Sequence, residues 1–180
     1  MTDAEKEAHA LLHDCERNAR YHTARRSFLD RGHRVMSMTA VLLAGSAAVA
    51  AISEAFKAES IVPILLMLVP TFVGAITLVW NPAGRARDHQ ILASRFYQIA
   101  REISLEPADT ERVKQWQADI LNVLEDEPPT IYFALNSACY NEASRAMYRQ
   151  PQRFYPLRRH QRLLRNWWPF SPGTFKLVDP

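Results

Sequence analysis

The sequence predicts an all-α membrane protein built around a two-helix transmembrane hairpin. Two stretches without any Asp, Glu, Lys, Arg or His, Val35–Ile52 and Ile61–Trp80, lie close together in a chain of 180 residues. As a helix, each stretch would cover roughly 27–30 Å, about the hydrocarbon thickness of a bilayer. Two buried helices of a globular core are the alternative, but so short a chain offers little protein to cover them on every side. No alternating apolar pattern is long enough to indicate a strand.

The segments around the first stretch are expected to be helical as well. Ala4–His33 is polar with scattered apolar residues, which indicates an amphipathic amino-terminal helix that runs into the first stretch. Gly32 is expected to loosen that junction. The first stretch is rich in alanine, and such small residues favour close packing of helices. The second stretch is more apolar, and Pro70 is expected to bend it.

Basic residues flank the hairpin on both sides. Four arginines precede the first stretch, and Arg85 and Arg87 follow the second, whereas the connector carries Glu54, Lys57 and Glu59. An excess of Lys and Arg marks the cytoplasmic side of a membrane protein. The sequence therefore predicts a multi-pass protein with both termini in the cytoplasm.

Three further helices are expected to form a cytoplasmic bundle. Asn81-Pro82 is typical of a helix cap followed by proline at the first helical position. Pro107 is expected to end this helix and Asp109 to cap the next, which stops at the acidic run Glu125–Glu127 and Pro128-Pro129. Ile131–Tyr148 is expected to form the third, so residues 1–148 make one helical unit. Apolar stripes at intervals of three and four residues are Leu92, Phe96, Ile99 and Ile103 in the first helix and Val113, Trp116, Ile120, Val123 and Leu124 in the second.

The tail over residues 149–180 differs in composition, with seven basic residues against one acidic residue and six interleaved aromatics. Three interpretations stay open. In the favoured interpretation, the tail lies on an anionic lipid surface. In the second, the tail is disordered and its arginines neutralise the acidic helices. In the least favoured, nucleic-acid bases stack on its aromatic side chains. The candidates for lipid contact are Arg158, Arg159, Arg162, Arg165, Trp167 and Trp168.

Residue patterns of known catalytic chemistry are nearly absent. The chain contains no Gly-rich phosphate loop, no His-Glu-x-x-His and no Cys-x-x-Cys. Cys15 and Cys139 are expected to be reduced thiols. His9 and His13 lie one helical turn apart near Cys15 and could hold a metal ion, but solvated histidines are the more common case. We therefore predict a protein that is not an enzyme and has no cofactor or metal.

Small and hydroxyl residues fall on common faces of the two apolar stretches. Thr39, Ser46 and Ser53 are spaced by seven, which places them close together on one face of a helix. Such faces either pack helices together or line the pore of an oligomer, because two helices alone enclose no aqueous path. The candidates for pore lining or helix packing are Thr39, Gly45, Ser46, Ser53, Pro70, Thr71, Gly74 and Thr77.

The order of these motifs resembles a known family. Arg20-Tyr21-His22 lies in the charged first helix, the hairpin follows, and the exit helix carries the remaining motif residues. This arrangement is similar to the SLATT superfamily, the SMODS- and SLOG-associating two-transmembrane effectors of bacteria. The resemblance covers about Leu11–Tyr148, and it indicates gating or structural roles for Asn81, Pro82, His89, Tyr97 and Glu102. For His89 a structural hydrogen bond or surface role is the default, with gating or pH sensing as the alternative.

The resemblance implies a pore-forming or membrane-perturbing effector of a bacterial nucleotide-signalling defence system. Such a protein would act as a homo-oligomer in the inner membrane, in contact with lipids, and its trigger would be a nucleotide second messenger or a sensor protein. The alternative is a constitutive membrane scaffold or anchor that docks a partner protein without conductance. Nucleic acid is not an expected partner.

Overall fold

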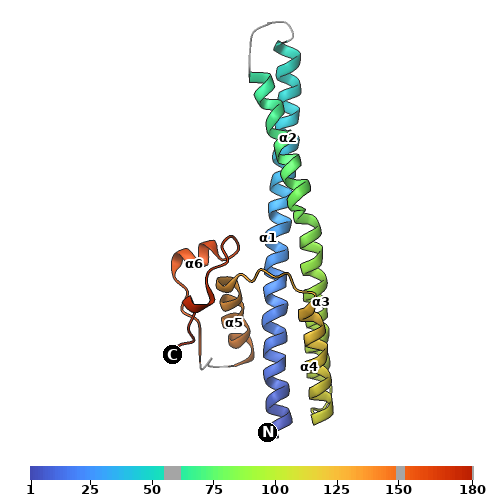
Figure 1. Cartoon of the computed structure of the whole chain (residues 1–180), viewed down its shortest axis with the longest axis vertical. Coiled ribbons are helices and arrows are strands. Elements are labelled where there is room, and N and C mark those ends of the chain that lie inside the picture. Colours follow the sequence, from blue (N-terminus) through green and yellow to red (C-terminus); the bar gives the residue numbers. More distant parts are fainter. Residues whose placement is uncertain (55–61, 149–152, 180) are drawn as a thin grey trace. The chain divides into compact units, whose positions relative to one another are not determined.

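A computed structural model describes residues 1–54, 62–148 and 153–179; the side chains at 46, 47, 49–54 and 62–67 lie outside that description. Within the described residues the only β contact is one antiparallel bridge, between Phe154 and Val178. All other regular structure there is helical, so the predicted all-α fold is confirmed (Figure 1). The elements are α1 (Asp3–Glu54), α2 (Val62–Trp80), α3 (Pro82–Leu105), α4 (Thr110–Glu125), α5 (Phe133–Met147), α6 (Arg159–Leu164) and a 3-10 turn, η1 (Pro172–Thr174).

The predicted transmembrane hairpin is not supported. Among the residues that the structure describes, no helix is both long and apolar enough to cross a membrane. The predicted spans, the predicted multi-pass position in a bacterial inner membrane and the description as a membrane pore former are therefore wrong for the described chain.

The chain divides into two compact units. Unit 1 comprises Met1–Arg25 and Asp88–Pro180, and unit 2 comprises Arg26–Arg87. The helix α1 is continuous through Gly32, where an added Cβ would meet nothing within 4 Å. The expected loosening at this glycine is therefore not observed.

Unit 2 consists of the second part of α1, the helix α2 and the first turn of α3. The two long helices run side by side in opposite directions (Figure 1). The helix α2 runs through Pro70, and the connector at 55–61 lies outside the described residues. Among the side chains of this unit that the structure describes, the buried ones are Leu29, Pro82 and Ala86.

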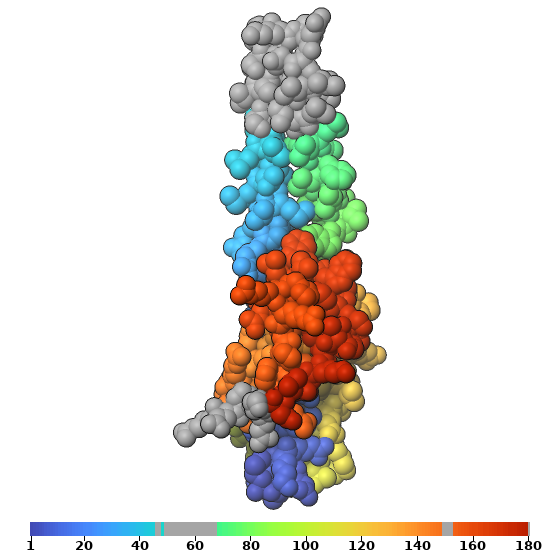
Figure 2. Space-filling model, turned by 90° about the vertical axis from the view of Figure 1, so that its left-hand side faces the viewer, coloured from blue at the N-terminus to red at the C-terminus, as the bar shows by residue number. Residues whose placement is uncertain are grey.

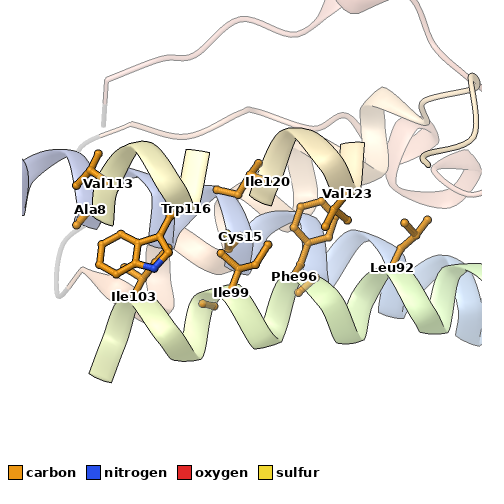
Figure 3. Close-up of a cluster of buried hydrophobic side chains, with 12 residues drawn as sticks. Ala8, Cys15, Leu92, Phe96, Ile99, Ile103, Val113, Trp116, Ile120 and Val123 are labelled. Atoms are coloured by element: carbon orange, nitrogen blue, oxygen red, sulfur yellow. The ribbon is translucent and has the colours of Figure 1, made fainter. Parts of the chain in front are cut away.

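The core of unit 1 lies between α3, α4 and the first part of α1. Figure 3 shows the side chains of α3 and α4 pointing toward one another, with Trp116 and Phe96 fully buried. Both predicted stripes face this core, except for Leu124, which remains 38% exposed. From α1 the core receives the small side chains Ala8, Cys15 and Ala19.

The helix α5 packs on another side of α1 within unit 1. Leu135 and Cys139 of α5 form a second buried cluster with Tyr21 of α1. The predicted caps and ends are also confirmed: Asp109 accepts a hydrogen bond from the backbone N–H of Arg112 at 2.7 Å, and α4 ends at the predicted acidic run. The first part of α1 is thus enclosed by helices on two sides, which is what brings its polar side chains into the interior.

Candidate functional site

A pair of histidines is buried in unit 1. His22 of α1 is fully buried and His89 of α3 is 6% exposed, and their Nδ1 atoms lie 2.8 Å apart. The other ring nitrogen of His22, Nε2, lies 2.9 Å from Oε1 of Glu127, which follows the end of α4. Three segments far apart in the sequence therefore meet in one hydrogen-bonded chain.

The hydrogen-bond partners determine which ring nitrogens of the two histidines carry protons. An ionised Glu127 can only accept a hydrogen bond, so His22 donates from Nε2. A neutral His22 then carries a lone pair on Nδ1, and His89 donates to it from its own Nδ1. Two imidazolium rings would set two N–H groups against each other at 2.8 Å. The bond between the histidines therefore requires that one of the two Nδ1 atoms carry no proton.

Aromatic rings enclose the pair. The ring of His22 stacks on Phe96 with centroids 5.7 Å apart and an angle of 9° between the planes. Tyr21 accepts a hydrogen bond at its hydroxyl from the backbone N–H of Tyr132, at 3.2 Å. Burial raises the pKa of the Tyr21 phenol, and the hydrogen bond from Tyr132 only partly offsets this. The stacking on Phe96 and the hydrogen bonds of both ring nitrogens hold the imidazole of His22 in one orientation.

A buried arginine joins α1 to the tail of the same unit. Arg25 is 6% exposed, and its Nη1 donates to the carbonyl oxygen of Asn166 at 2.7 Å. Its guanidinium carbon lies 3.7 Å from the centroid of the Tyr132 ring, a cation–π contact. The backbone N–H of Tyr132 also donates a hydrogen bond to Tyr21, which is a neighbour of His22. Arg25 therefore connects the residues around the histidine pair to the tail.

A second histidine cluster joins α1 to α5. Nε2 of His13 lies 2.9 Å from the hydroxyl oxygen of Ser144, and its ring packs edge-on against Tyr140 at 4.8 Å. Burial alone would raise the pKa of the Asp14 carboxyl, but His13 and Arg17 outweigh it and hold that pKa below its usual value.

The order carboxylate, imidazole and hydroxyl in this cluster is that of a hydrolase triad, but the geometry differs. The nearest approach of His13 Nδ1 to the Asp14 carboxylate is 3.8 Å, beyond hydrogen-bond distance. Ser144 is 3% exposed, so a substrate could not reach its hydroxyl. The cluster therefore fits a structural connection between two helices. His9 lies at its edge, with Nδ1 3.2 Å from the hydroxyl of Tyr148.

Asn81 forms the predicted cap, in unit 2. Its Oδ1 accepts a hydrogen bond from the N–H of Gly84 at 3.1 Å, while its own N–H bonds the carbonyl oxygen of Thr77, so it closes α2 and opens α3. Its φ of 45° is a left-handed conformation that Asn tolerates better than most residues. A Cβ at Gly84 would lie 2.4 Å from Nδ2 of Asn81, so the cap requires glycine there.

The other motif residues of α3 lie apart from the histidine pair. Tyr97 is exposed and Glu102 is half-buried, and both line an open depression of about 590 Å³ on the outer side of α3. Pro82 is buried at the start of the helix. Of the five motif candidates, His89 alone belongs to the buried network.

The candidates for pore lining or helix packing belong to unit 2, and they do not form a buried cluster in the described part. The Thr77 hydroxyl donates to the carbonyl oxygen of Val73 at 2.8 Å, within its own helix. Added Cβ atoms at Gly45 and Gly74 would meet nothing within 4 Å. Thr39, Gly45, Thr71 and Gly74 are exposed, Pro70 and Thr77 are half-buried, and the side chains of Ser46 and Ser53 lie outside the described residues.

The tail candidates lie on the described part of the tail, residues 153–179 of unit 1. Arg158, Arg159 and Arg162 are exposed and Arg165 is half-buried. Trp167 and Trp168 are 65% and 63% exposed. None of these side chains lies in the buried histidine network.

No group of three or more His, Cys, Asp or Glu side chains with metal-binding geometry occurs in the described part of the chain. Cys15 and Cys139 are both free and buried. Burial raises the pKa of each thiol to about 12. The suggested grouping of His9, His13 and Cys15 is not formed, because Cys15 faces the α3–α4 core while His13 faces α5.

Comparison with models of known protein families, with curated proteins and with solved structures finds no match to this chain. The resemblance to the SLATT superfamily therefore remains a prediction.

Sequence reasoning missed most of the buried polar network. Glu127 belongs to an acidic run that is typical of a solvated helix end, yet its side chain turns inward to His22. Arg25 stands among basic residues that indicated a membrane flank, yet it is buried. The one available signal was that His22 and His89 are both among the residues on which the resemblance to the SLATT superfamily rests.

Proposed function

We propose that this chain is a non-enzymatic helical protein that works as an assembly of copies joined through unit 2. The observation that carries the proposal is a pair of exposed apolar stripes, one on each long helix of that unit. A monomer rarely leaves so many large apolar side chains in contact with water.

The stripe on α1 has the spacing of a helix-pairing surface. Val35, Met38 and Leu42 are 64%, 65% and 69% exposed, and Gly45 continues the alternation of three and four residues. This is the spacing of the apolar positions in a heptad repeat, which packs against another helix. In the described part of the unit, an added Cβ at Gly45 would meet nothing within 4 Å, so the close approach that glycine permits is available to a second copy.

The helix α2 repeats the pattern. Val69, Phe72, Ile76 and Val79 are separated by three, four and three residues, and their side chains are 44%, 68%, 39% and 84% exposed. A stable interface covers roughly 800 Å² per partner, on about 20–30 residues a side. In this proposal the seven large side chains of the two stripes form the apolar centre of such an interface.

A second copy of the chain fits these stripes better than a single foreign helix. Two stripes on two antiparallel helices need two helices to cover them, and the same unit of another copy supplies both. The stripes carry no charge, so the pairing depends on apolar contact. The segment that joins copies in this proposal is packed against protein and crosses no membrane.

The resemblance to the SLATT superfamily supports the remaining part of the proposal. On that basis unit 1 receives a signal, a nucleotide second messenger or a sensor protein, and the signal changes how copies associate. The buried histidine network gives unit 1 a single ordered arrangement that such a signal would act on.

The assembly is tested by light scattering coupled to size-exclusion chromatography on the full chain. We expect a defined oligomer at micromolar concentration. Phe72→Glu and Leu42→Glu should convert it to monomer, because each buries a charge in the contact. Leu78→Glu is the matched control: this residue is 82% exposed on the same helix but lies off the stripe, so the oligomer should persist.

Two outcomes would contradict the assembly. One is a wild-type monomer at these concentrations. The other is a protein that stays monomeric because detergent, and not a second copy, covers its apolar stripes. The trigger is tested separately, by adding cyclic nucleotides and following the oligomer distribution. An assembly that no nucleotide changes would favour a constitutive scaffold over a signalled effector.

A further inference from the structure

We propose that the described tail, residues 153–179, is an ordered platform that binds the surface of an anionic lipid bilayer without any segment crossing it. The occupant is a layer of phosphate-bearing lipid headgroups. The proposal does not depend on the assembly described above, because it concerns side chains of unit 1 alone.

The platform is held in place by internal contacts of the tail. The backbones of Phe154 and Val178 exchange two hydrogen bonds of 3.0 Å, which closes the segment into a loop. Arg153 pairs with Asp179, with Nε and Oδ1 3.1 Å apart. Gln161 is 3% exposed, and its Oε1 accepts the N–H of Arg158 at the start of α6 at 2.8 Å.

The platform is also attached to the helices of unit 1. The side chain of Asn141 on α5 makes two hydrogen bonds of 2.8 Å with the backbone N–H and carbonyl oxygen of Tyr155. Arg25 of α1 binds the carbonyl oxygen of Asn166. These contacts come from buried or half-buried groups, so the segment between Tyr155 and Asn166 is ordered before any partner arrives.

What the platform exposes is basic and apolar together. Leu163, Trp167 and Trp168 are 79%, 65% and 63% exposed. Figure 2 shows residues 153–179, in orange and red, as one continuous surface of unit 1. Because Arg153 and Asp179 pair with each other, five basic residues remain without an acidic residue among them: Arg158, Arg159, Arg162, Arg165 and Lys176.

The combination fits a bilayer surface better than other acidic partners. Tryptophan prefers the boundary between headgroups and hydrocarbon, and arginine binds phosphate oxygens. Side chains exposed by 63–79% protrude from the surface, as insertion into a soft interface requires, whereas a protein partner would need matching pockets. Leu163 offers no ring on which a nucleic-acid base could stack.

The test is flotation of the full chain with vesicles of phosphatidylcholine alone and with vesicles containing added phosphatidylglycerol. We expect binding to rise with the anionic lipid and to fall at high salt. Binding to neutral vesicles gives the apolar contribution, which comes from the stripes of unit 2 and from the tryptophans of the tail. The difference in binding between the two vesicle types is therefore the quantity compared. Arg159→Glu with Arg162→Glu should reduce this difference by more than roughly tenfold at low salt.

Arg101→Glu with Lys114→Glu is the charge-matched control, because both residues are exposed on α3 and α4. It should leave the difference between vesicle types nearly unchanged. Trp167→Ala with Trp168→Ala should weaken binding to both vesicle types. On vesicles, the amide hydrogen exchange of residues 158–168 in the unaltered chain should slow.

Three results would overturn the proposal. Equal losses in the tail variant and the control variant would mean that net charge alone drives binding. No loss in the tail variant, with circular dichroism unchanged, would mean that the platform does not touch lipid. Tighter binding to a single-stranded oligonucleotide than to anionic vesicles at the same salt concentration would identify nucleic acid as the occupant.

Discussion

The Nδ1 atoms of His22 and His89 lie 2.8 Å apart in the interior of unit 1, so a single proton must lie between them. The opposite nitrogen of His22 donates to Glu127. At neutral pH we therefore expect His22 to carry its proton on Nε2 and His89 on Nδ1. Nitrogen chemical shifts of selectively labelled histidines measure this directly, and the reverse assignment would contradict the hydrogen-bond chain.

Substitutions of Glu127 measure how much this chain of hydrogen bonds contributes to the free energy of unfolding. Glu127→Gln keeps an acceptor for His22 and loses only the charge, which should cost about 1 kcal/mol of unfolding free energy. Glu127→Leu leaves the buried Nε2–H of His22 without a partner and should cost about 2–4 kcal/mol. Urea denaturation of the two variants gives the comparison. If both are equally stable, the bond to Glu127 does not contribute.

How far the sequence predicts this fold depends on the kind of residue. The stripes of α3 and α4 were predictable because large apolar residues recur at helical spacing. The spacing also predicts Leu124 in the core, but its side chain is 38% exposed, since Val123 beside it already fills the inward position. The first part of α1 was less predictable, because its core positions are Ala8, Cys15 and Ala19, small residues that carry little hydrophobic signal.

The polar network was beyond sequence reasoning for a physical reason. The burial of His22 and Arg25 and the inward turn of Glu127 depend on partners 67 to 141 positions away in the chain, which no local pattern reports. Uncharged stretches indicate burial from water but do not identify what covers them. For that reason the two stretches predicted a membrane hairpin, whereas no helix of the described chain is long and apolar enough to cross a membrane.

Asn81 and Gly84 should be strongly coupled, because the cap side chain occupies the space of a Cβ at residue 84. In the unaltered chain, Gly84→Ala displaces Asn81 and should destabilise the first turn of α3 by about 1 kcal/mol. In an Asn81→Gly background the obstacle is gone, and the same substitution should stabilise that turn by about 0.5–1 kcal/mol through helix propensity.

Hydrogen exchange of the first amides of α3 measures both effects. Asn81→Ala serves as a further comparison, since alanine loses the cap and must also adopt the φ of 45°. It should be worse than Asn81→Gly by about 1–2 kcal/mol. Additive effects at residues 81 and 84 would show that the cap does not restrict residue 84.

The two buried thiols should react only when unit 1 opens. Because burial raises the pKa of Cys15 and Cys139 from 9.0 to about 12, almost no thiolate is present in the folded chain at neutral pH. Alkylation should therefore be slow in buffer and fast in urea. The single variants Cys15→Ala and Cys139→Ala assign each rate, and rapid labelling of either native thiol would contradict its burial.

The same shift predicts how stability depends on pH. The unfolded thiols ionise near pH 9 and the folded ones near pH 12, so the folded state binds more protons between these values. The free energy of unfolding should therefore be unaffected below pH 9 and should fall above it, by up to about 1.4 kcal/mol per pH unit for each thiol. Either alanine variant should make the slope shallower.

The tail should detach from unit 1 when its contact with α5 is removed. Asn141 makes both hydrogen bonds to the Tyr155 backbone, and alanine can make neither. Asn141→Ala should speed hydrogen exchange and tryptic cleavage around Arg158 and Arg159, while the amides of α3 and α4 keep their protection. Asn122→Ala, at an exposed position on α4, is the matched control and should change neither. If the tail of Asn141→Ala stays protected, Arg25 and Gln161 suffice to hold it, and the contact with α5 does not order the tail.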